Sequence, residues 1–204
     1  MIFKLMHRVL LDKLNTQSRV LIGLDGFSGS GKTTLVDTLR TELALYNLPL
    51  TVVHLDDLIT ERSKRYNSGF DEWHEHYHLQ WDAARIAETL FQSWARGDHQ
   101  LPLDVYDSAT GTVSLQPLEV PPNGILLVEG VFLQRAEWRD FYDFLLYLDC
   151  PRSTRFQRVS TRGHQDPNDP ARLAVYERRY WAAEDHYLQT VQPLQRADLV
   201  LDSK

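Results

Sequence analysis

The sequence predicts an α/β fold in which a parallel β-sheet carries helices on both faces. Short apolar runs alternate along the chain with segments whose apolar residues recur at helical spacing, and this alternation is typical of sheets built from strand–helix–strand units. A glycine-rich segment, "GLDGFSGSGKTTL" (residues 23–35), lies between the first apolar run and the first helical pattern. Because ligands of such sheets bind beyond the carboxyl ends of the strands, this segment is the first candidate for a binding site.

The expected elements follow one another in a regular order. Apolar runs such as "RVLIGLD" and "GILLVEGVF" predict buried strands, because strands that are covered on both faces lack polar alternation. The expected strands are residues 19–25, 50–56, 124–132, 141–150 and 197–202. Apolar residues at helical spacing, or a closing glycine, predict helices at residues 32–46, 82–97, 152–163 and 171–191. Two short strands predict a small hairpin at residues 101–118, which would help to form the wall of a ligand pocket.

Composition bounds the class of protein. A chain of 204 residues with 43% hydrophobic and 25% charged residues is expected to form one domain, residues 1–204, with a helical N-terminal extension over residues 1–18. No apolar stretch reaches about 18 residues, which argues against a membrane span. The single cysteine, Cys150, suits the cytoplasm. The net charge of -6 argues against general affinity for nucleic acid.

The glycine-rich segment matches the phosphate-loop (P-loop) pattern G-x-x-x-x-G-K-[ST], or Walker A, at Gly26, Gly31, Lys32 and Thr33. Glycines let successive backbone N–H groups turn inward around an anion, and the helix that follows directs its positive end at the same point. Lys32 is expected to reach the β- and γ-phosphates of ATP, and the Thr33 hydroxyl to bind Mg²⁺. The expected nucleotide contacts are Gly26, Ser28, Gly29, Ser30, Gly31, Lys32, Thr33 and Thr34. The sequence thus predicts a P-loop NTPase fold.

Carboxylates follow two of the expected strands. Asp56 and Asp57 end the run "VVHLDD", and Glu129 ends the run "LLVE". Phosphoryl transfer to a hydroxyl requires Mg²⁺ handling and a group that receives the proton. The aspartates are candidates for the base or for a metal contact through water, and Glu129 stands where a Walker B acid contacts Mg²⁺ or water. The structural alternatives are a turn or helix cap for the aspartates and a solvated strand end for Glu129.

Four arginines recur at steps of three and four residues, which places them on one side of a helix: Arg152, Arg155, Arg158 and Arg162. Four like charges repel one another unless an anion compensates them. The region of about residues 152–172 is therefore expected to form a lid that closes over the triphosphate and stabilises charge in the transition state. The alternative is a solvated face that pairs with nearby carboxylates.

Two further features have both a functional and a structural interpretation. Tyr106 and Asp107 end one strand of the expected hairpin, where they could line an acceptor site or simply end a strand. His74, His76 and His78 alternate in "EWHEHYH" and would share a face on a strand, but no fourth metal ligand accompanies them. We expect a substrate contact from one of these histidines rather than a metal site.

Taken together, these segments resemble the uridine kinase-like family of P-loop kinases, whose relatives include phosphoribulokinase, pantothenate kinase and nicotinamide riboside kinase. The resemblance covers about residues 19–202. It implies that Asp56 of "VVHLDDLI" is the catalytic base and that Glu129 of "LLVEGVF" lies near Mg²⁺. It also implies that Tyr106 and Asp107 of "LDVYD" lie in the acceptor site.

The resemblance extends to the region of the expected lid. "CPRSTRFQRVSTRG" resembles the lid helix of the family, which implies that Arg158 and Arg162 contact the phosphates. "RADLVLD" resembles the last strand, which lies near the adenine. The lid helix here ends in Arg-Gly, where the family usually has Arg-Asp.

The acceptor half of the chain departs further from the family pattern. Uridine kinases usually follow Tyr-Asp with a segment that carries His and Arg, whereas this chain has "YDSATGTV". A Phe-Asp-x-Pro-like segment is replaced by "YHLQWD". The sequence therefore predicts Mg²⁺-dependent transfer of the γ-phosphoryl group of ATP to a hydroxyl of a small molecule, with uridine or another nucleoside as one candidate. Kinases of this type often form homo-oligomers.

The sequence leaves one other class of P-loop protein open and disfavours two. A nucleotide-binding regulatory ATPase module without a small-molecule acceptor remains an alternative, and an acceptor pocket beside Asp56 would discriminate against it. A GTPase is disfavoured because the chain has no Asn-Lys-x-Asp segment. A nucleic-acid-dependent ATPase is disfavoured by the acidic charge and the short length.

Overall fold

The structure is a computed structural model that describes residues 13–14, 16–162, 166 and 169–203. Most of the N-terminal extension expected over residues 1–18 lies outside these residues, as does much of the segment that joins the two halves of the expected lid. Arg162 ends a described helix, but its side chain is outside the described part of the chain. Among the described residues, no helix is long and apolar enough to cross a membrane.

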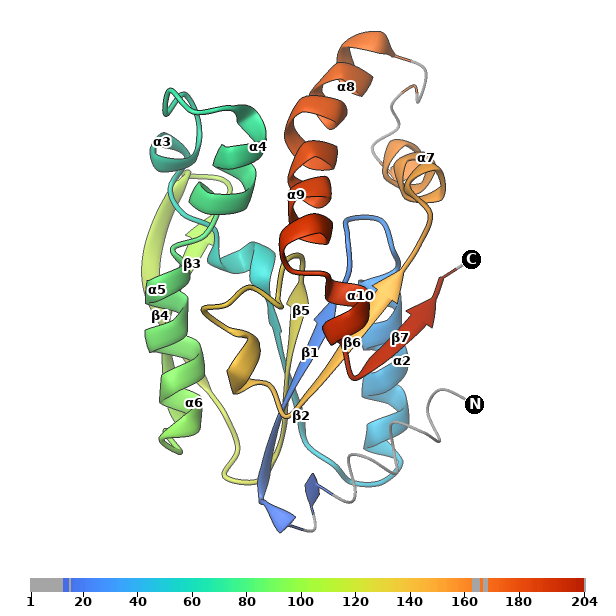
Figure 1. Ribbon diagram of the computed structural model, residues 1–204. Coiled ribbons are helices and arrows are strands. Elements are labelled where there is room, and N and C mark those ends of the chain that lie inside the picture. The colour runs from blue at the N-terminus through green and yellow to red at the C-terminus, as the bar shows by residue number, and fades with distance from the viewer. Residues whose placement is uncertain (1–12, 15, 163–165, 167–168, 204) are drawn as a thin grey trace.

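Five parallel strands form the central sheet of the described chain, in the spatial order β2, β5, β1, β6, β7 (Figure 1). In that order their bounds are Leu50–His54, Gly124–Gly130, Arg19–Asp25, Phe144–Asp149 and Leu199–Asp202. Every residue of β5 is buried, as expected for a parallel strand that has strands on both sides and helices on both faces. The predicted fold class, a P-loop NTPase-like α/β sheet, is confirmed.

Helix α2 (Lys32–Ala44) packs on one face of the sheet. Its inward residues Val36 and Leu39 join Ile22 of β1 and Leu127 of β5 in one buried cluster. Side chains alternate between the two faces along each strand, so the intervening strand residues belong to the core on the opposite face. The predicted helix at residues 32–46 is present and ends two residues earlier than expected.

Helices from two distant parts of the chain cover the opposite face. The first consists of α5 (Ala83–Ile86), a π-helical turn (Ala87–Gln92) and α6 (Ser93–Ala95). The second consists of α8 (Pro170–Val175), a π-helical turn (Tyr176–Trp181) and α9 (Ala182–Thr190), and α10 (Pro193–Arg196) follows it. Phe91 and Tyr187 from these helices join Leu126 and Tyr147 of the strands in the larger core cluster. The second helix therefore contacts the sheet through α9 and extends past the P-loop, where its residues Tyr180 and Trp181 line a hollow with Ser28.

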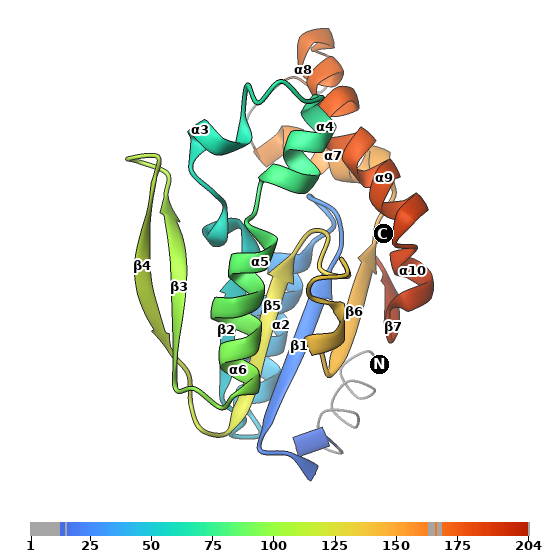
Figure 2. The same ribbon diagram turned by 60° about the vertical axis from the view of Figure 1, so that its left-hand side comes forward.

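The predicted hairpin is present as a two-stranded antiparallel sheet, formed by β3 (Gln100–Asp107) and β4 (Thr112–Glu119). Figure 2 shows the hairpin beside α5 and α6, at the side of the molecule nearest β2. Leu101 and Leu103 of β3 are buried, whereas Leu115 of β4 is exposed. One strand therefore anchors the hairpin, and the other faces solvent.

The segment between β2 and α5 holds short elements that the sequence does not predict. They are a 3-10 turn (Leu55–Leu58), α3 (Arg62–Arg65) and α4 (Glu72–His74), which a π-helical turn (Glu75–Leu79) continues. The strand expected over residues 50–56 ends at His54, so Asp56 and Asp57 lie on the 3-10 turn. Leu55 and Leu58 of this turn are buried and the two aspartates are exposed, a helical pattern that a four-residue element is too short to reveal.

Candidate active site

The carboxyl ends of β1, β2 and β5 meet at one edge of the sheet. Glu129 of β5 pairs in register with Leu24 of β1 on one side and with His54 of β2 on the other. The P-loop begins directly after β1, and the 3-10 turn that carries Asp56 begins directly after β2. The sheet therefore brings together the P-loop and both predicted acids, which are more than 70 residues apart in sequence.

The P-loop adopts a backbone that only glycine accepts easily. Gly26, Gly29 and Gly31 have φ values of 148°, 80° and 102°, in the region that strains other residues. A Cβ atom on Gly26 would lie 2.7 Å from the carbonyl oxygen of Leu148 on β6, and one on Gly29 would lie 2.7 Å from that of Arg155 on α7 (Arg152–Arg162). The glycines thus permit both the curvature of the loop and its close contact with its neighbours.

Lys32 folds back over the P-loop. Its ammonium group donates to the carbonyl oxygens of Gly26, at 2.9 Å, and Phe27, at 3.3 Å, and the residue is only 8% exposed. Burial lowers the pKa of Lys32, and the nearby carboxylates of Glu129 and Asp56 oppose that shift. A buried ammonium that is close to carboxylates and to the loop backbone is placed to interact with phosphate oxygens.

Asp56 and Glu129 both interact electrostatically with Lys32, but their surroundings differ. Asp56 is exposed in surface area, yet surrounding protein atoms remove enough hydration to raise its pKa; Lys32 opposes this shift and Glu129 adds to it. Glu129 is 8% exposed, and its Oε1 lies 2.9 Å from His54 Nδ1. Its Oε2 is buried without a hydrogen-bond partner among the described residues. The sequence prediction did not identify His54, although the residue directly precedes "LDD".

The oxygen atoms at this edge are suited to a metal ion that is shared with phosphates. Glu129 Oε2 and Ser30 Oγ are both buried and lack partners in the described chain, which is unusual because buried polar atoms are normally satisfied. Thr33 is exposed in the first turn of α2. Among the described residues, no group of three His, Cys, Asp or Glu could hold a metal without other ligands. Carboxylate and hydroxyl oxygens that leave positions for phosphate and water fit Mg²⁺.

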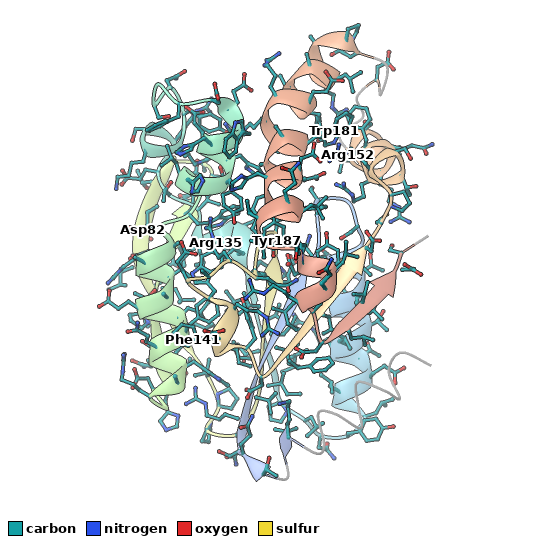
Figure 3. All side chains as sticks on the ribbon, viewed as in Figure 1. Asp82, Arg135, Phe141, Arg152, Trp181 and Tyr187 are labelled. Carbon is teal, nitrogen blue, oxygen red and sulfur yellow. The ribbon has the colours of Figure 1, made fainter. Side chains whose placement is uncertain are left out.

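The arginines of α7 divide into two groups. Arg155 is buried and forms a bidentate ion pair with Glu184 of α9, at 2.6 and 2.8 Å. Arg152 lies 2.5 Å from Asp185 and packs over the ring of Trp181. Figure 3 shows Arg152 and Trp181 together beside α7. The carboxylate pairing of the alternative prediction occurs at both arginines, but Arg155 is buried, so they do not form the solvated face that this alternative expected. They connect α7 to α9.

Arg158 instead faces the P-loop. Its Nη1 lies 3.4 Å from the carbonyl oxygens of Gly29 and Ser30 and 3.1 Å from Ser203 Oγ, just after β7. It also lines a groove of about 350 Å³ with Thr34 and Leu201. The predicted partner residue Arg162 cannot be compared, since its side chain lies outside the described residues. Arg155 also contacts the loop, through the Ser28 carbonyl oxygen at 3.4 Å and the ring of Phe27, but it is paired with Glu184, whereas Arg158 contacts the P-loop and Ser203.

The predicted acceptor residues Tyr106 and Asp107 have different environments. The Tyr106 ring lies under the guanidinium group of Arg65, 5.1 Å from its centre. Asp107 accepts hydrogen bonds from Ala109 N and Thr110 Oγ1 in the tip of the hairpin, and these bonds lower its pKa. These contacts are those of a turn residue, and the assignment of Asp107 to the acceptor site stays a prediction. A strand-end Asp before a turn has this role commonly.

The three histidines of "EWHEHYH" lie on a helix, so their side chains diverge. The ring centres of His74 and His78 lie 4.4 Å apart, with the ring planes tilted by 36°. His76 points the other way and lines a hollow of about 150 Å³ together with Ser28, Phe132 and Tyr180. This hollow lies between the tip of the P-loop, α7 and the π-helical turn Tyr176–Trp181. Of the three histidines, His76 is the one next to the P-loop.

A buried polar network that the sequence prediction missed holds the start of the P-loop. The carboxylate of Asp25 is fully buried and accepts from Gly26 N at 2.8 Å, Gln134 Nε2 at 3.1 Å and the Tyr187 hydroxyl at 2.6 Å. Burial raises the pKa of Asp25, and these hydrogen bonds oppose the shift. Figure 3 shows Tyr187 at the lower end of α9, directed toward the sheet. The only signal in the sequence is a polar residue at the end of the apolar run "LIGLD".

Comparison with known proteins agrees with this geometry. A family model described as an AAA domain matches residues 22–181. A solved structure described as a "possible uridine kinase", from Bacillus stearothermophilus, is 39% identical, superposes with a TM-score of 0.76, and covers 98% of this chain and 100% of its own. The curated uridine kinase of Oceanobacillus iheyensis is 26% identical over 92% of this chain and 88% of its own length. That of Staphylococcus haemolyticus is 24% identical over 85% and 78%, respectively.

The matches include the P-loop, the acids at the strand ends and most of the sheet. Since the family match extends over most of the chain and the 39% identical relative covers nearly all of it, the similarity is not limited to the nucleotide loop. The chain belongs to the AAA-domain family of P-loop proteins and, within the P-loop proteins, to the uridine kinase-like kinases.

Proposed function

We propose that this protein transfers the γ-phosphoryl group of ATP to a hydroxyl of a small-molecule acceptor, with Mg²⁺ as cofactor. The observation that carries the proposal is the convergence of Lys32, Asp56 and an unpartnered oxygen of Glu129 at one edge of the sheet. A phosphate loop alone fits many NTPases. A carboxylate of raised pKa in the electrostatic field of the P-loop lysine fits transfer to a hydroxyl, which must lose a proton.

The reaction assigns each group a role. The acceptor oxygen forms a bond to the γ-phosphorus, the bond from that phosphorus to the β–γ bridging oxygen breaks, and ADP leaves with the electron pair. Asp56 receives the hydroxyl proton. Lys32 and Arg158 stabilise negative charge on the transferring group and on ADP. Mg²⁺, held by Thr33 and through water by Glu129, would offset charge on the β- and γ-phosphates.

The groove beside Arg158 is the proposed site of the nucleotide base. It has a volume of about 350 Å³ and is lined by Thr34 and Thr38 of α2, by Leu148 of β6 and by Leu201 of β7. Apolar and hydroxyl groups next to the P-loop suit a planar base whose phosphates enter the loop. A groove for the base supports a donor, such as ATP, whose base contacts the protein as well as its phosphates.

The acceptor, assembly and location are also proposals. Relatives named uridine kinase make a nucleoside one candidate acceptor. We propose that residues 1–204 act as a single kinase domain in the cytoplasm, that homo-oligomers form, and that neither nucleic acid nor a membrane is a partner, in keeping with one cysteine and a net charge of -6.

The test is ADP release from ATP and Mg²⁺ with and without candidate acceptors. Stimulation by an acceptor, with formation of its phosphate ester, supports a kinase; slow ADP release that no acceptor stimulates favours the regulatory ATPase module. Asp56→Asn should retain ATP affinity and lower kcat by about 10²–10⁴-fold. The exposed Asp140→Asn variant serves as the matched control, and normal turnover by Asp56→Asn would refute the assignment of the base.

A further inference from the structure

Two buried arginines pack against one tyrosine near the candidate site. Arg65 of α3 and Arg179 of the π-helical turn Tyr176–Trp181 have their guanidinium carbons 5.0 and 4.3 Å from the ring centre of Tyr66. They are only 7% and 3% exposed. These side chains come from segments more than 100 residues apart, so the tertiary fold brings two positive charges into one buried place.

The charge of this pair is only partly compensated. Arg179 Nη1 lies 3.1 Å from Glu75 Oε2, but its Nε and Nη2 are buried with no hydrogen-bond partner among the described residues. Arg65 donates to the Thr60 carbonyl oxygen at 3.0 Å and to the Tyr66 hydroxyl at 3.2 Å, both uncharged. The other buried arginines of the described chain, Arg135, Arg155 and Arg179, each form an ion pair, whereas Arg65 forms none there.

A buried guanidinium without a carboxylate is costly, because burial removes its hydration and no opposite charge replaces it. Glu75 compensates one of the two positive charges, and it also accepts hydrogen bonds from the backbone and hydroxyl of Ser68. One positive charge and two N–H donors of Arg179 therefore remain to be satisfied. An anionic ligand would satisfy them.

The arginine pair adjoins the proposed acceptor site. Arg65 covers the ring of Tyr106, and Tyr180, the neighbour of Arg179, lines the hollow at the tip of the P-loop. Tyr180 also lines the open cavity that contains Tyr66 and Arg179. The two hollows thus share a wall. The carboxylates in the lining of the open cavity each pair with an arginine, Glu72 with Arg178 and Glu75 with Arg179. A small molecule with a hydroxyl near the P-loop could extend its other end toward the arginines.

The positive charges of Arg179 and Arg65 also affect His76. Burial, and next the charges of Arg179 and Arg65, lower its pKa to about 3. The imidazole is therefore neutral at physiological pH and does not add to the positive charge. Its Nδ1 is buried without a partner among the described residues, and its ring lies 4.9 Å from that of Tyr180. A polar atom is thus present beside Tyr180, in the lining of the hollow at the P-loop.

We infer that Arg65 and Arg179 bind an anionic group of the acceptor, so that the molecule phosphorylated is a hydroxyl compound carrying a carboxylate or phosphate rather than a neutral nucleoside. The inference rests on the proposed kinase function, which it makes more specific. Guanidinium groups present pairs of N–H donors that match the oxygens of either anion. A site with such donors selects against a neutral analogue, because its buried polar groups would stay unpaired.

Binding is tested first, independently of turnover. The wild-type protein is saturated with Mg²⁺ and a non-hydrolysable ATP analogue, so that the P-loop is filled, and is titrated with inorganic phosphate or malonate at constant ionic strength while Tm is measured. We expect a saturable rise in Tm, retained by Lys64→Met and weakened at least about tenfold in apparent affinity by Arg65→Met. Lys64 is a matched control because it lies on the same short helix but is exposed.

Each outcome of that titration decides the inference. No saturable rise in the wild type, or an equal rise in Arg65→Met, overturns it. Retained affinity of Arg65→Met for the ATP analogue shows that the variant is folded. If it does not fold, Arg65→Lys, which keeps the charge but loses the planar fork, takes its place and should weaken anion binding by a smaller factor. Whether phosphate or malonate binds more tightly distinguishes a phosphate-bearing acceptor from a carboxylate-bearing one.

Turnover is tested with matched acceptor pairs that differ in the anionic group: pantothenate with pantothenol, glycerate with glycerol, and ribose 5-phosphate with ribose, with uridine as the neutral nucleoside. We expect an anionic member to have a kcat/KM at least about tenfold above its neutral partner, a preference that Arg65→Met removes. Efficient phosphorylation of uridine without a response to anions would refute the inference but leave the kinase function standing. Anion binding without phosphorylation of any acceptor would refute the kinase function but leave the anion site standing.

Discussion

His54 Nδ1 lies 2.9 Å from Glu129 Oε1, and the two residues are direct neighbours in the register of β2 and β5. This contact occupies one oxygen of Glu129 and leaves the other, Oε2, without a partner among the described residues. A carboxylate held at one oxygen has a fixed orientation, so its second oxygen can face a ligand or a metal-bound water without loss of side-chain entropy.

We expect His54→Asn to lower the affinity of the proposed kinase for Mg²⁺ and so to raise the Mg²⁺ concentration that it requires. Loss of the contact frees the Glu129 side chain to rotate, and changes to such outer partners cost about 10–100-fold in metal affinity or activity. The measurement is the Mg²⁺ concentration that gives half-maximal ADP release at saturating ATP and acceptor. His99→Asn, at an exposed histidine, is the control. An unchanged Mg²⁺ requirement in His54→Asn would show that His54 does not orient Glu129 toward the metal.

Arg155 and Arg158 lie one turn apart on α7, but their variants should behave differently. Arg155→Met removes the bidentate partner of the buried Glu184 and leaves it only the longer contact with Arg152, at 3.4 Å. The free energy of unfolding is therefore expected to fall by up to about 3–5 kcal/mol. Arg158 lies at the carbonyl oxygens of the P-loop, so Arg158→Met should lower kcat by about 10²-fold or more.

Urea unfolding and steady-state kinetics of both variants test this difference. Near-normal kcat in Arg158→Met would contradict a role of this arginine in charge stabilisation. Near-normal stability in Arg155→Met would contradict the structural role of the buried ion pair.

The pKa of His76 predicts a loss of stability in mild acid. Its folded-state pKa of about 3 lies below the ordinary histidine value of about 6.5, so the unfolded chain binds a proton that the folded protein does not. The contribution of neutral His76 to the free energy of unfolding is fully present above about pH 6.5. As the pH falls from about 6.5 toward 3, the free energy of unfolding decreases by up to about 1.4 kcal/mol per pH unit.

We therefore expect urea unfolding of His76→Phe to show a shallower decline in the free energy of unfolding between pH 7 and 5 than the wild type. His78 and His186 also have lowered pKa values and contribute in the same direction, so the variant keeps part of the slope. His99→Asn is the comparison at an exposed histidine. Identical slopes in the wild type and His76→Phe would mean that His76 titrates normally.

Gly29→Ala and Gly111→Ala separate backbone strain from steric conflict. Both glycines have similar positive φ values, 80° and 74°, which cost a non-glycine residue of order 1–3 kcal/mol. Only at Gly29 would the new Cβ lie 2.7 Å from a backbone oxygen, that of Arg155; Gly111 has no atom within 4 Å. We expect Gly29→Ala to be less stable than Gly111→Ala and to lose ATP affinity, as measured by thermal unfolding and nucleotide titration. Equal stability and normal ATP affinity in both variants would contradict the tight contact between the P-loop and α7.

The strands could be predicted from the sequence because each is a run of apolar residues that the sheet buries on both faces. β1 has the bounds expected from "RVLIGLD", and the hairpin lies where the sequence places it. The segment from Asp56 to Leu79 could not be predicted in the same way. Its elements are three to five residues long, too short for a periodic pattern, and they depend on contacts with distant helices.

The sequence by itself determined the parallel sheet, the P-loop with its lysine, and two acids, one that follows β2 and one that lies in β5. These features depend on local spacing and on burial along one strand. Tertiary structure alone decided which charges are compensated. Identical arginines on α7 differ because Glu184 of α9 meets Arg155, whereas Arg158 faces the P-loop. Similarly, Arg65 lacks an ion pair in the described chain only because of where α3 packs. Charge compensation depends on distances between segments far apart in the chain, and spacing along a sequence does not contain those distances.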